Sequence, residues 1–296
     1  MATLSEWIAG ARPRTLPAAI APVIVGTAAA AAHHDAEEGA KGAVLGLALL
    51  ALLVSCCLQI GVNYANDYSD GIRGTDEERV GPVRLVGQGL AEPGLVKLAA
   101  ISFLGLGAFI GFALVALSQA WILLPIGVLA LLAAWRYTGG DNPYGYRGLG
   151  EVYVFVFFGL VATLGTLYTQ IGTITAVGVL GAIGVGALAS AILVANNLRD
   201  IPTDSVTGKT TLAVRLGDAR TRRLYLVLFA VAAVCTVLMA FWKPWAPVAV
   251  VALLIAWPGI TAVRGGATGR ALIPALALTG LAELVWACAL VIPLAI

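Results

Sequence analysis

The chain has 296 residues, of which 60% are hydrophobic and only 11% are charged. Soluble domains are about 45–50% apolar and about 25% charged, so this composition excludes a water-soluble globular protein and a disordered chain. The 18 basic and 16 acidic residues nearly balance, which argues against a nucleic-acid binder with a concentrated basic face. We therefore expect an integral membrane protein.

Nine apolar segments are long enough to cross a bilayer, for which a helix needs about 20 residues. Because lipid offers no partner to backbone N–H and C=O groups, these segments must be helical. In chain order they are residues 16–33, 43–64, 98–117, 120–136, 152–170, 173–196, 224–242, 246–263 and 271–292. The sequence thus predicts one all-α transmembrane domain, over residues 1–296, with nine transmembrane helices.

Basic residues lie almost entirely on one side of this predicted topology. Apart from Lys41 and Lys243, every Lys and Arg falls in the N-terminal segment or in connections on the same side as that segment. Since cytoplasmic connections of membrane proteins are rich in Lys and Arg, the N-terminus is predicted to be cytoplasmic, in the cell membrane. Two connections on that side, roughly 65–97 and 197–223, are long, and we expect them to form a cap that carries the function.

Two similar acidic motifs stand at the ends of the second and sixth apolar segments. Each has one amide followed by two carboxylates, spaced so that all three side chains share one face of a continuing helix. Carboxylate and amide oxygens suit Mg²⁺, which often binds substrate phosphates as well. The predicted metal ligands are Asn63, Asp67 and Asp70 in the first motif and Asn196, Asp200 and Asp204 in the second.

Basic residues near both motifs are suited to neutralise a diphosphate held between them. Arginine makes bidentate contacts with phosphate, and lysine acts as a point charge. The candidates are Arg73, Arg79 and Arg84 after the first motif and Arg199, Lys209 and Arg215 around the second.

With these motifs the chain resembles the UbiA superfamily of intramembrane prenyltransferases. The resemblance covers essentially the whole chain and rests on three stretches: 66–71 leading to 79–84, 196–204 leading to 208–217, and 137–151. The first motif of that family often has a third acid four residues after the second, where this chain has Gly74.

The resemblance implies helices around a central cavity, Mg²⁺ as cofactor, and transfer of a polyprenyl group from polyprenyl diphosphate. It is closest to the family members that prenylate 1,4-dihydroxy-2-naphthoate with loss of CO₂ and diphosphate, giving demethylmenaquinone in menaquinone biosynthesis. Other acceptors, such as 4-hydroxybenzoate, haem or chlorophyllide, are alternatives. Apart from these substrates and the lipid bilayer, no partner is inferred, and no nucleic acid.

Residue chemistry and resemblance together give a set of candidate site residues. The predicted catalytic residues are Asp67, Asp70, Asp200, Asp204 and Lys209. The predicted substrate-binding residues are Asn63, Asn66, Tyr68, Arg79, Arg84, Tyr137, Arg147, Asn196, Asn197 and Arg215.

This set suits prenyl transfer on chemical grounds. Ionising an allylic diphosphate requires the charge of the leaving group to be held, and an apolar cavity keeps the resulting carbocation from water. Aromatic faces stabilise such a cation, and Tyr64, Tyr68 and Tyr137 are candidates for that role.

Two other classes of membrane protein fit the residues less well. A transporter would be expected to carry charge near the bilayer midplane, whereas these carboxylates lie at helix ends. A CDP-alcohol phosphotransferase motif also begins as residues 67–71 do, but it requires Ala-Arg where this chain has Gly74 and Thr75.

Overall fold

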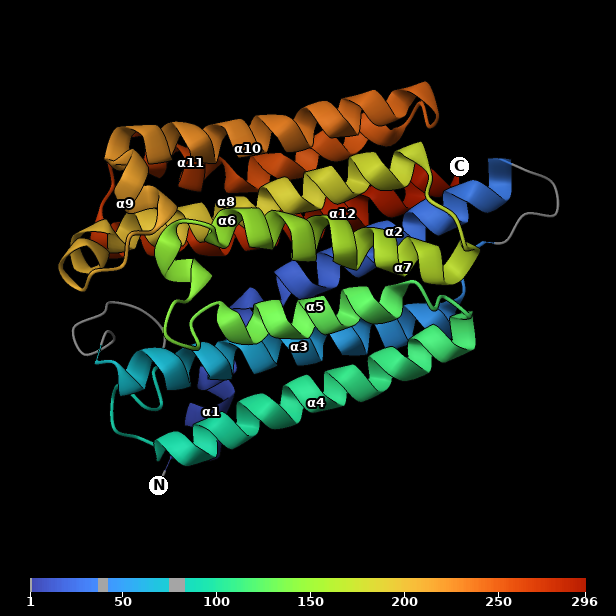
Figure 1. The fold of residues 1–296 in the computed structure, drawn as a ribbon. Coiled ribbons are helices and arrows are strands. Elements are labelled where there is room, and N and C mark those ends of the chain that lie inside the picture. Colours follow the sequence, from blue (N-terminus) through green and yellow to red (C-terminus); the bar gives the residue numbers. More distant parts are fainter. Residues whose placement is uncertain (1, 37–41, 75–82) are drawn as a thin grey trace.

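The computed structural model describes residues 2–36, 42–74 and 83–296. Within these ranges every regular element is a helix, which confirms the all-α prediction for that part of the chain. Most of the helices run side by side and form an elongated bundle (Figure 1). Arg79 lies outside the described residues, so its role stays a prediction.

The N-terminal part of the chain builds the helices that lie lowest in Figure 1 and one helix of the centre. A short helix and a 3₁₀ turn lead into the first long helix, and the two parts meet at a bend of 47°. The elements are α1 (Leu4–Gly10), η1 (Pro13–Thr15), α2 (Pro17–Ala36), α3 (Leu45–Ile72), α4 (Pro93–Ser118) and α5 (Leu123–Arg136).

The remaining elements build the centre and the top of the bundle. Three of them follow one another without a break and form one long helix with a π-helical middle, namely α6 (Gly150–Val154), η3 (Phe155–Val161) and α7 (Ala162–Ile171). The others are η2 (Tyr144–Arg147), α8 (Ala176–Val206), α9 (Leu212–Leu216), α10 (Asp218–Leu238), η4 (Met239–Phe241), η5 (Ala246–Ala256), α11 (Trp257–Arg264), η6 (Gly269–Leu272) and α12 (Ile273–Ala295).

All nine predicted spans fall on helices of this bundle. Among the described residues, 7 helices are long and apolar enough to cross a membrane, and the bent pair Leu4–Thr15 and Pro17–His33 gives an eighth. The ninth predicted span corresponds to α5, which has only 14 residues and is shorter than the others. The chain is thus a multi-pass membrane protein with at least seven helices of spanning length.

The long predicted connections are more helical than expected. The stretch 197–223 was expected to be a loop, but α8 continues through both aspartates to Val206, and α9 and α10 follow soon after. The reason is packing, because Leu198 and Ile201 continue the buried face of α8. Since α3 likewise continues to Ile72, both acidic motifs stand on helices, as their spacing predicts.

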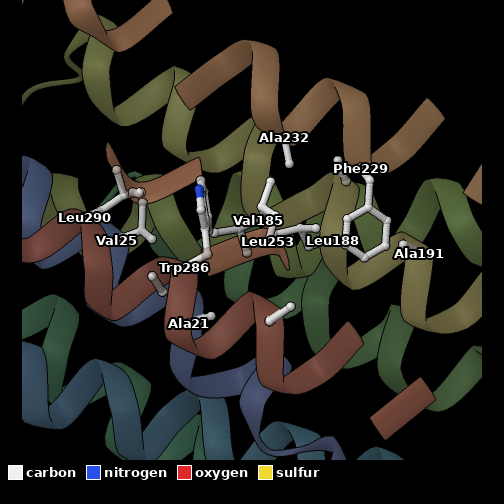
Figure 2. Packing of buried hydrophobic residues seen from close by; sticks show 14 of the residues in the cluster. Ala21, Val25, Val185, Leu188, Ala191, Phe229, Ala232, Leu253, Trp286 and Leu290 are labelled. Atoms are coloured by element: carbon white, nitrogen blue, oxygen red, sulfur yellow. The ribbon is translucent and has the colours of Figure 1, made fainter. Parts of the chain in front are cut away.

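Trp286 of α12 occupies the centre of the main hydrophobic core. Figure 2 shows its ring among side chains from α2, α8, η5 and α10, including Val25, Val185 and Leu253. The ring is fully buried, and its Nε1 donates a hydrogen bond to Thr236 Oγ1 at 2.9 Å. This core makes α8 the central helix to which neighbouring helices are fixed.

Small residues let the neighbours approach α8 closely, as is common between membrane helices. A Cβ atom on Gly184 would lie 2.6 Å from the ring of Trp286. A Cβ atom on Gly159 of η3 would lie 2.4 Å from the Cα atom of Gly186. The π-helical segment and α8 therefore touch backbone to backbone.

Asp67 fixes the segment that follows α3. It is fully buried, and its two carboxylate oxygens accept backbone N–H groups from Leu85 at 2.7 Å and from Val86 at 3.1 Å. These charge-assisted hydrogen bonds hold residues 83–86 against α3 and so place the side chain of Arg84.

We expect Gly159→Ala to destabilise the protein by about 1–3 kcal/mol, because the added methyl group meets the backbone of α8, which cannot yield as a side chain would. Thermal unfolding of the purified protein in detergent measures the effect. The matched control is Gly105→Ala in α4, where nothing lies within 4 Å of the added carbon. Equal melting temperatures for the two variants would contradict the close contact.

We expect Asp67→Ala to lower the free energy of unfolding by about 3 kcal/mol, since it leaves two buried N–H groups without an acceptor. The measurement is thermal unfolding in the presence of EDTA. A residue that served only as a metal ligand would show no loss of stability under those conditions. Asp218→Ala is the control, because that carboxylate is 56% exposed and its ion pair with Arg222 contributes little.

Candidate active site

A cavity of about 920 Å³ lies among α2, α3, α4, α5, α7 and α8, and it has two chemically distinct ends. One end is apolar and is lined by side chains such as Val54, Val115 and Leu124. The other end lies where α3 and α8 finish, beside η2, on the left of Figure 1. Most of the polar residues predicted for the site lie at this second end.

The first motif supplies three of its residues to the cavity wall, namely Asn63, Asn66 and Asp70. Asp70 is buried, and Lys209 Nζ lies 3.3 Å from its Oδ2 atom. Asn66 Oδ1 accepts a hydrogen bond from Thr138 Oγ1 at 2.8 Å. Asn63 Nδ2 donates to the carbonyl of Ala11 at 2.9 Å. Its amide thus holds the connection between α1 and η1, which is a structural role.

The second motif is a hydrogen-bonded network on the opposite helix. Asn196, Asn197 and Asp204 line the cavity, together with Arg199. Arg199 donates two hydrogen bonds to Asp200, from Nε to Oδ1 at 2.6 Å and from Nη2 to Oδ2 at 2.7 Å. The same Nη2 donates to Asn196 Oδ1 at 2.8 Å. Asp200 is therefore neutralised by its neighbour in the sequence, and it lies behind the cavity wall.

Among the residues that the structure describes, positive charge is in excess at the polar end. The cavity lining contains five basic side chains and two carboxylates, those of Asp70 and Asp204. The basic ones are Arg12, Arg14, Arg84, Arg199 and Lys209. An anion with several charges is the ligand that such a surface attracts.

Nine of the predicted site residues line the cavity: Asn63, Asn66, Asp70, Arg84, Tyr137, Asn196, Asn197, Asp204 and Lys209. The structure does not bring Asp67, Tyr68, Arg147, Asp200 and Arg215 to that wall. Arg147 and Arg215 are exposed, and Arg215 donates to the carbonyl of Thr210. Asp67 holds the backbone of residues 85 and 86 and is fully buried away from the cavity wall, so this geometry does not support the metal-ligand role predicted for it.

Aromatic residues cover one wall of the cavity, but they are mostly not the ones expected. Tyr64 packs against Trp7, and the ring of Tyr68 lies between Trp135 and Lys97, so neither tyrosine lines the cavity.

The aromatic wall is instead formed by Tyr137, Tyr144, Tyr153 and Phe157. The rings of Tyr144 and Tyr153 stack at 3.7 Å, and Phe157 continues the row at 6.0 Å from Tyr153. Burial, together with the rings of Tyr137 and Tyr153, raises the pKa of the Tyr144 phenol. Tyr144 therefore stays neutral and donates to the carbonyl of Ala133 at 2.9 Å.

Arg73 has a structural role in place of the predicted phosphate contact. Its guanidinium donates to the carbonyls of Thr138 and Gly140, and so ties the end of α3 to the turn before η2. The sequence indicates Arg199 as a basic candidate for the diphosphate, but it does not indicate a role for Tyr146. The spacing of the second motif signals Arg199, since it directly precedes Asp200; Tyr146 has no such signal outside its Gly-rich stretch.

The donor set fits a hard divalent cation that shares its ligands with a bound anion. Among the described residues, no three His, Cys, Asp or Glu side chains form a metal-binding group by themselves. Mg²⁺ does not need such a cage, because it commonly takes one or two carboxylates and completes its shell with phosphate oxygens and water. Asp70 and Asp204 are the two carboxylates that line the cavity, from α3 and α8, and they are therefore the candidates for such binding.

Curated proteins of similar sequence carry one name across several bacteria. The chain is 57% identical to "1,4-dihydroxy-2-naphthoate octaprenyltransferase" of Mycobacterium tuberculosis, over 98% of this chain and 96% of that protein. It is 41% identical to the protein of the same name in Escherichia coli, over 78% of this chain and 75% of that protein.

Solved structures share the fold at low sequence identity. A UbiA homologue from Archaeoglobus fulgidus, bound to GPP and Mg²⁺, superimposes with a TM-score of 0.71 at 17% identity, covering 98% of this chain and all of that one. The family model for the UbiA prenyltransferase family matches residues 19–268. With this match and these relatives, the chain belongs to the UbiA prenyltransferase family.

Proposed function

We propose that this prenyltransferase moves a polyprenyl group from polyprenyl diphosphate to 1,4-dihydroxy-2-naphthoate, and that diphosphate and CO₂ leave. The observation that carries the proposal is the two-ended cavity, with five basic side chains and two carboxylates at one end and apolar side chains at the other. Such a cavity matches a donor with a charged head and a hydrocarbon tail. The acceptor is proposed from the name shared by the curated relatives.

Asp70 and Asp204 would hold Mg²⁺ together with the donor diphosphate, with Asn196 beside them. When bound, Mg²⁺ neutralises diphosphate oxygens and so favours departure of the leaving group. Asp200 belongs to the same site through Arg199, because its carboxylate fixes the guanidinium that faces the cavity. Asp67 and Asn63 are not proposed as metal ligands. They hold neighbouring backbone segments in place around the site.

Basic side chains would bind the leaving group from one helix and two connecting segments. Arg84 is placed by the Asp67 contact, Arg199 by Asp200, and Lys209 by Asp70. Because these cations are already oriented before the donor arrives, they stabilise the developing negative charge without further reorganisation.

The remainder of the cavity would protect the prenyl cation and receive the acceptor. The C–O bond of the allylic diphosphate breaks, and the prenyl carbon then bonds to the carboxyl-bearing carbon of the naphthoate, which loses CO₂. Water is excluded by the apolar lining. The faces of Tyr137, Tyr144 and Tyr153 suit both the cation and the flat acceptor ring.

The polar end of the cavity is proposed to face the cytoplasm, in the cell membrane. The support is the positive-inside distribution of Lys and Arg, which puts the ends of α3 and α8 on the cytoplasmic side. On the same grounds α5 is proposed as a span, which would make nine.

The direct test is turnover by the purified protein in nanodiscs with octaprenyl diphosphate, 1,4-dihydroxy-2-naphthoate and Mg²⁺. The expected result is prenylated 1,4-naphthoquinol, which dissolved oxygen oxidises to the quinone during work-up, and one CO₂ per product, with loss of activity in EDTA and recovery when Mg²⁺ is added. Product from 4-hydroxybenzoate, but none from the naphthoate, would refute the proposed acceptor.

We expect Asp70→Ala and Asp204→Ala each to lower kcat/KM by about 10²–10³, since each removes a group that helps to hold charge in the transition state. Initial rates at saturating Mg²⁺ measure the effect, and thermal unfolding checks that the variants fold. Asp218→Asn, which changes an exposed carboxylate away from the cavity, is the control. Activity near that of the control in both aspartate variants would refute the proposed metal site.

A further inference from the structure

Tyr146 joins three segments at the polar end of the cavity. It lies in η2, and its hydroxyl donates a hydrogen bond to Asp70 Oδ1 at 2.6 Å, across 76 positions of sequence. Its backbone carbonyl accepts two hydrogen bonds from Thr210, from the amide at 2.9 Å and from Oγ1 at 2.8 Å. The residue thus connects the end of α3 to the stretch that follows α8.

The ring of Tyr146 also makes cation–π contacts with two basic side chains. Lys209 Nζ lies 4.6 Å from the ring centroid, and the guanidinium carbon of Arg73 lies 5.5 Å from it. Since Lys209 Nζ also lies 3.3 Å from Asp70 Oδ2, the tyrosine, the aspartate and the lysine form one closed group. Each oxygen of Asp70 therefore has a defined partner.

These contacts orient the carboxylate of Asp70 and leave it able to bind a further cation. A carboxylate oxygen has two lone pairs, so Oδ1 can accept the phenol and still bind a cation. Carboxylates that bind metals in proteins are commonly fixed by such hydrogen bonds, and loss of the outer partner typically costs 10–100-fold in metal affinity. The half-buried Tyr146 is in the position of such a partner.

We propose that Tyr146 is a positioning residue for the metal–diphosphate site, through its hydrogen bond to Asp70 and its ring contact with Lys209. The inference rests on the proposed function, because it takes Asp70 as a metal ligand. It makes the η2 turn a third element of the site, beside the two aspartate motifs.

The test is Tyr146→Phe, which removes the hydroxyl and keeps the ring. Binding of Mn²⁺ in the presence of inorganic pyrophosphate is followed by electron paramagnetic resonance of the free ion. We expect affinity for Mn²⁺ to fall at least 10-fold, and the Mg²⁺ concentration for half-maximal turnover to rise by a similar factor. The melting temperature should change no more than in the control.

The matched control is Tyr225→Phe, which also removes one phenol hydrogen bond, that to Thr279 at 2.7 Å, but in the core away from the cavity. A purely structural role for Tyr146 would give the two variants the same Mn²⁺ affinity, and this result would overturn the proposal. Tighter Mn²⁺ binding by Tyr146→Phe would overturn it too, since the phenol would then compete with the metal.

A double-mutant cycle covers the case in which Tyr146→Phe is less stable. If the hydroxyl acts through Asp70, Tyr146→Phe should have little further effect on Mn²⁺ binding in an Asp70→Asn background. An undiminished effect in that background would overturn the proposal. The binding assay contains no acceptor, so a failure of prenyl transfer to the naphthoate is read separately from a failure of this inference.

Discussion

Keeping buried charges paired beside an apolar cavity is the constraint on which the rest of this structure depends. An unpaired charge away from water costs several kcal/mol, so each carboxylate of the two motifs has to have a partner. Asp67 takes two backbone N–H groups, Asp200 takes Arg199, and Asp70 takes Lys209 and Tyr146. The segments that supply these partners are thereby fixed around the cavity. The need to pair these charges therefore determines the architecture of the polar end.

Packing in the apolar part of the bundle holds the polar end rigidly in place. Helix α8 carries the second motif, and its glycines allow η3 and the ring of Trp286 to pack directly against its backbone. Because the same helix extends from the core into the polar end, Asn196 and Asp204 stand on a scaffold held by packing along its length. Groups that must hold a charge in the transition state gain most when they are held in this way.

Composition and spacing predicted much of this molecule. The apolar segments fall on helices, and the motifs identified Asp70, Asp204, Asn196 and Lys209, which all line one cavity. Helical periodicity gives the face on which a residue lies but not what covers that face. The sequence therefore does not distinguish Asp67 from Asp70, although in the structure residues 85 and 86 cover only Asp67. The role of Tyr146 was out of reach for a related reason. It arises where the η2 turn contacts α3, 76 positions earlier in the chain, and a local sequence pattern does not indicate such a long-range contact.

The shortness of α5 has a consequence for the surrounding lipid. Its 14 residues span about 21 Å, whereas the hydrocarbon core of a bilayer is about 30 Å thick. Leu129 and Leu132 on this helix are exposed. If α5 spans the bilayer as proposed, local thinning of the membrane is one way to meet this mismatch. α5 also forms one side of the cavity. Under the proposed nine-span topology, such thinning would bring lipid headgroups closer to the cavity wall that α5 forms, and so shorten the path of a lipid-anchored diphosphate into the cavity.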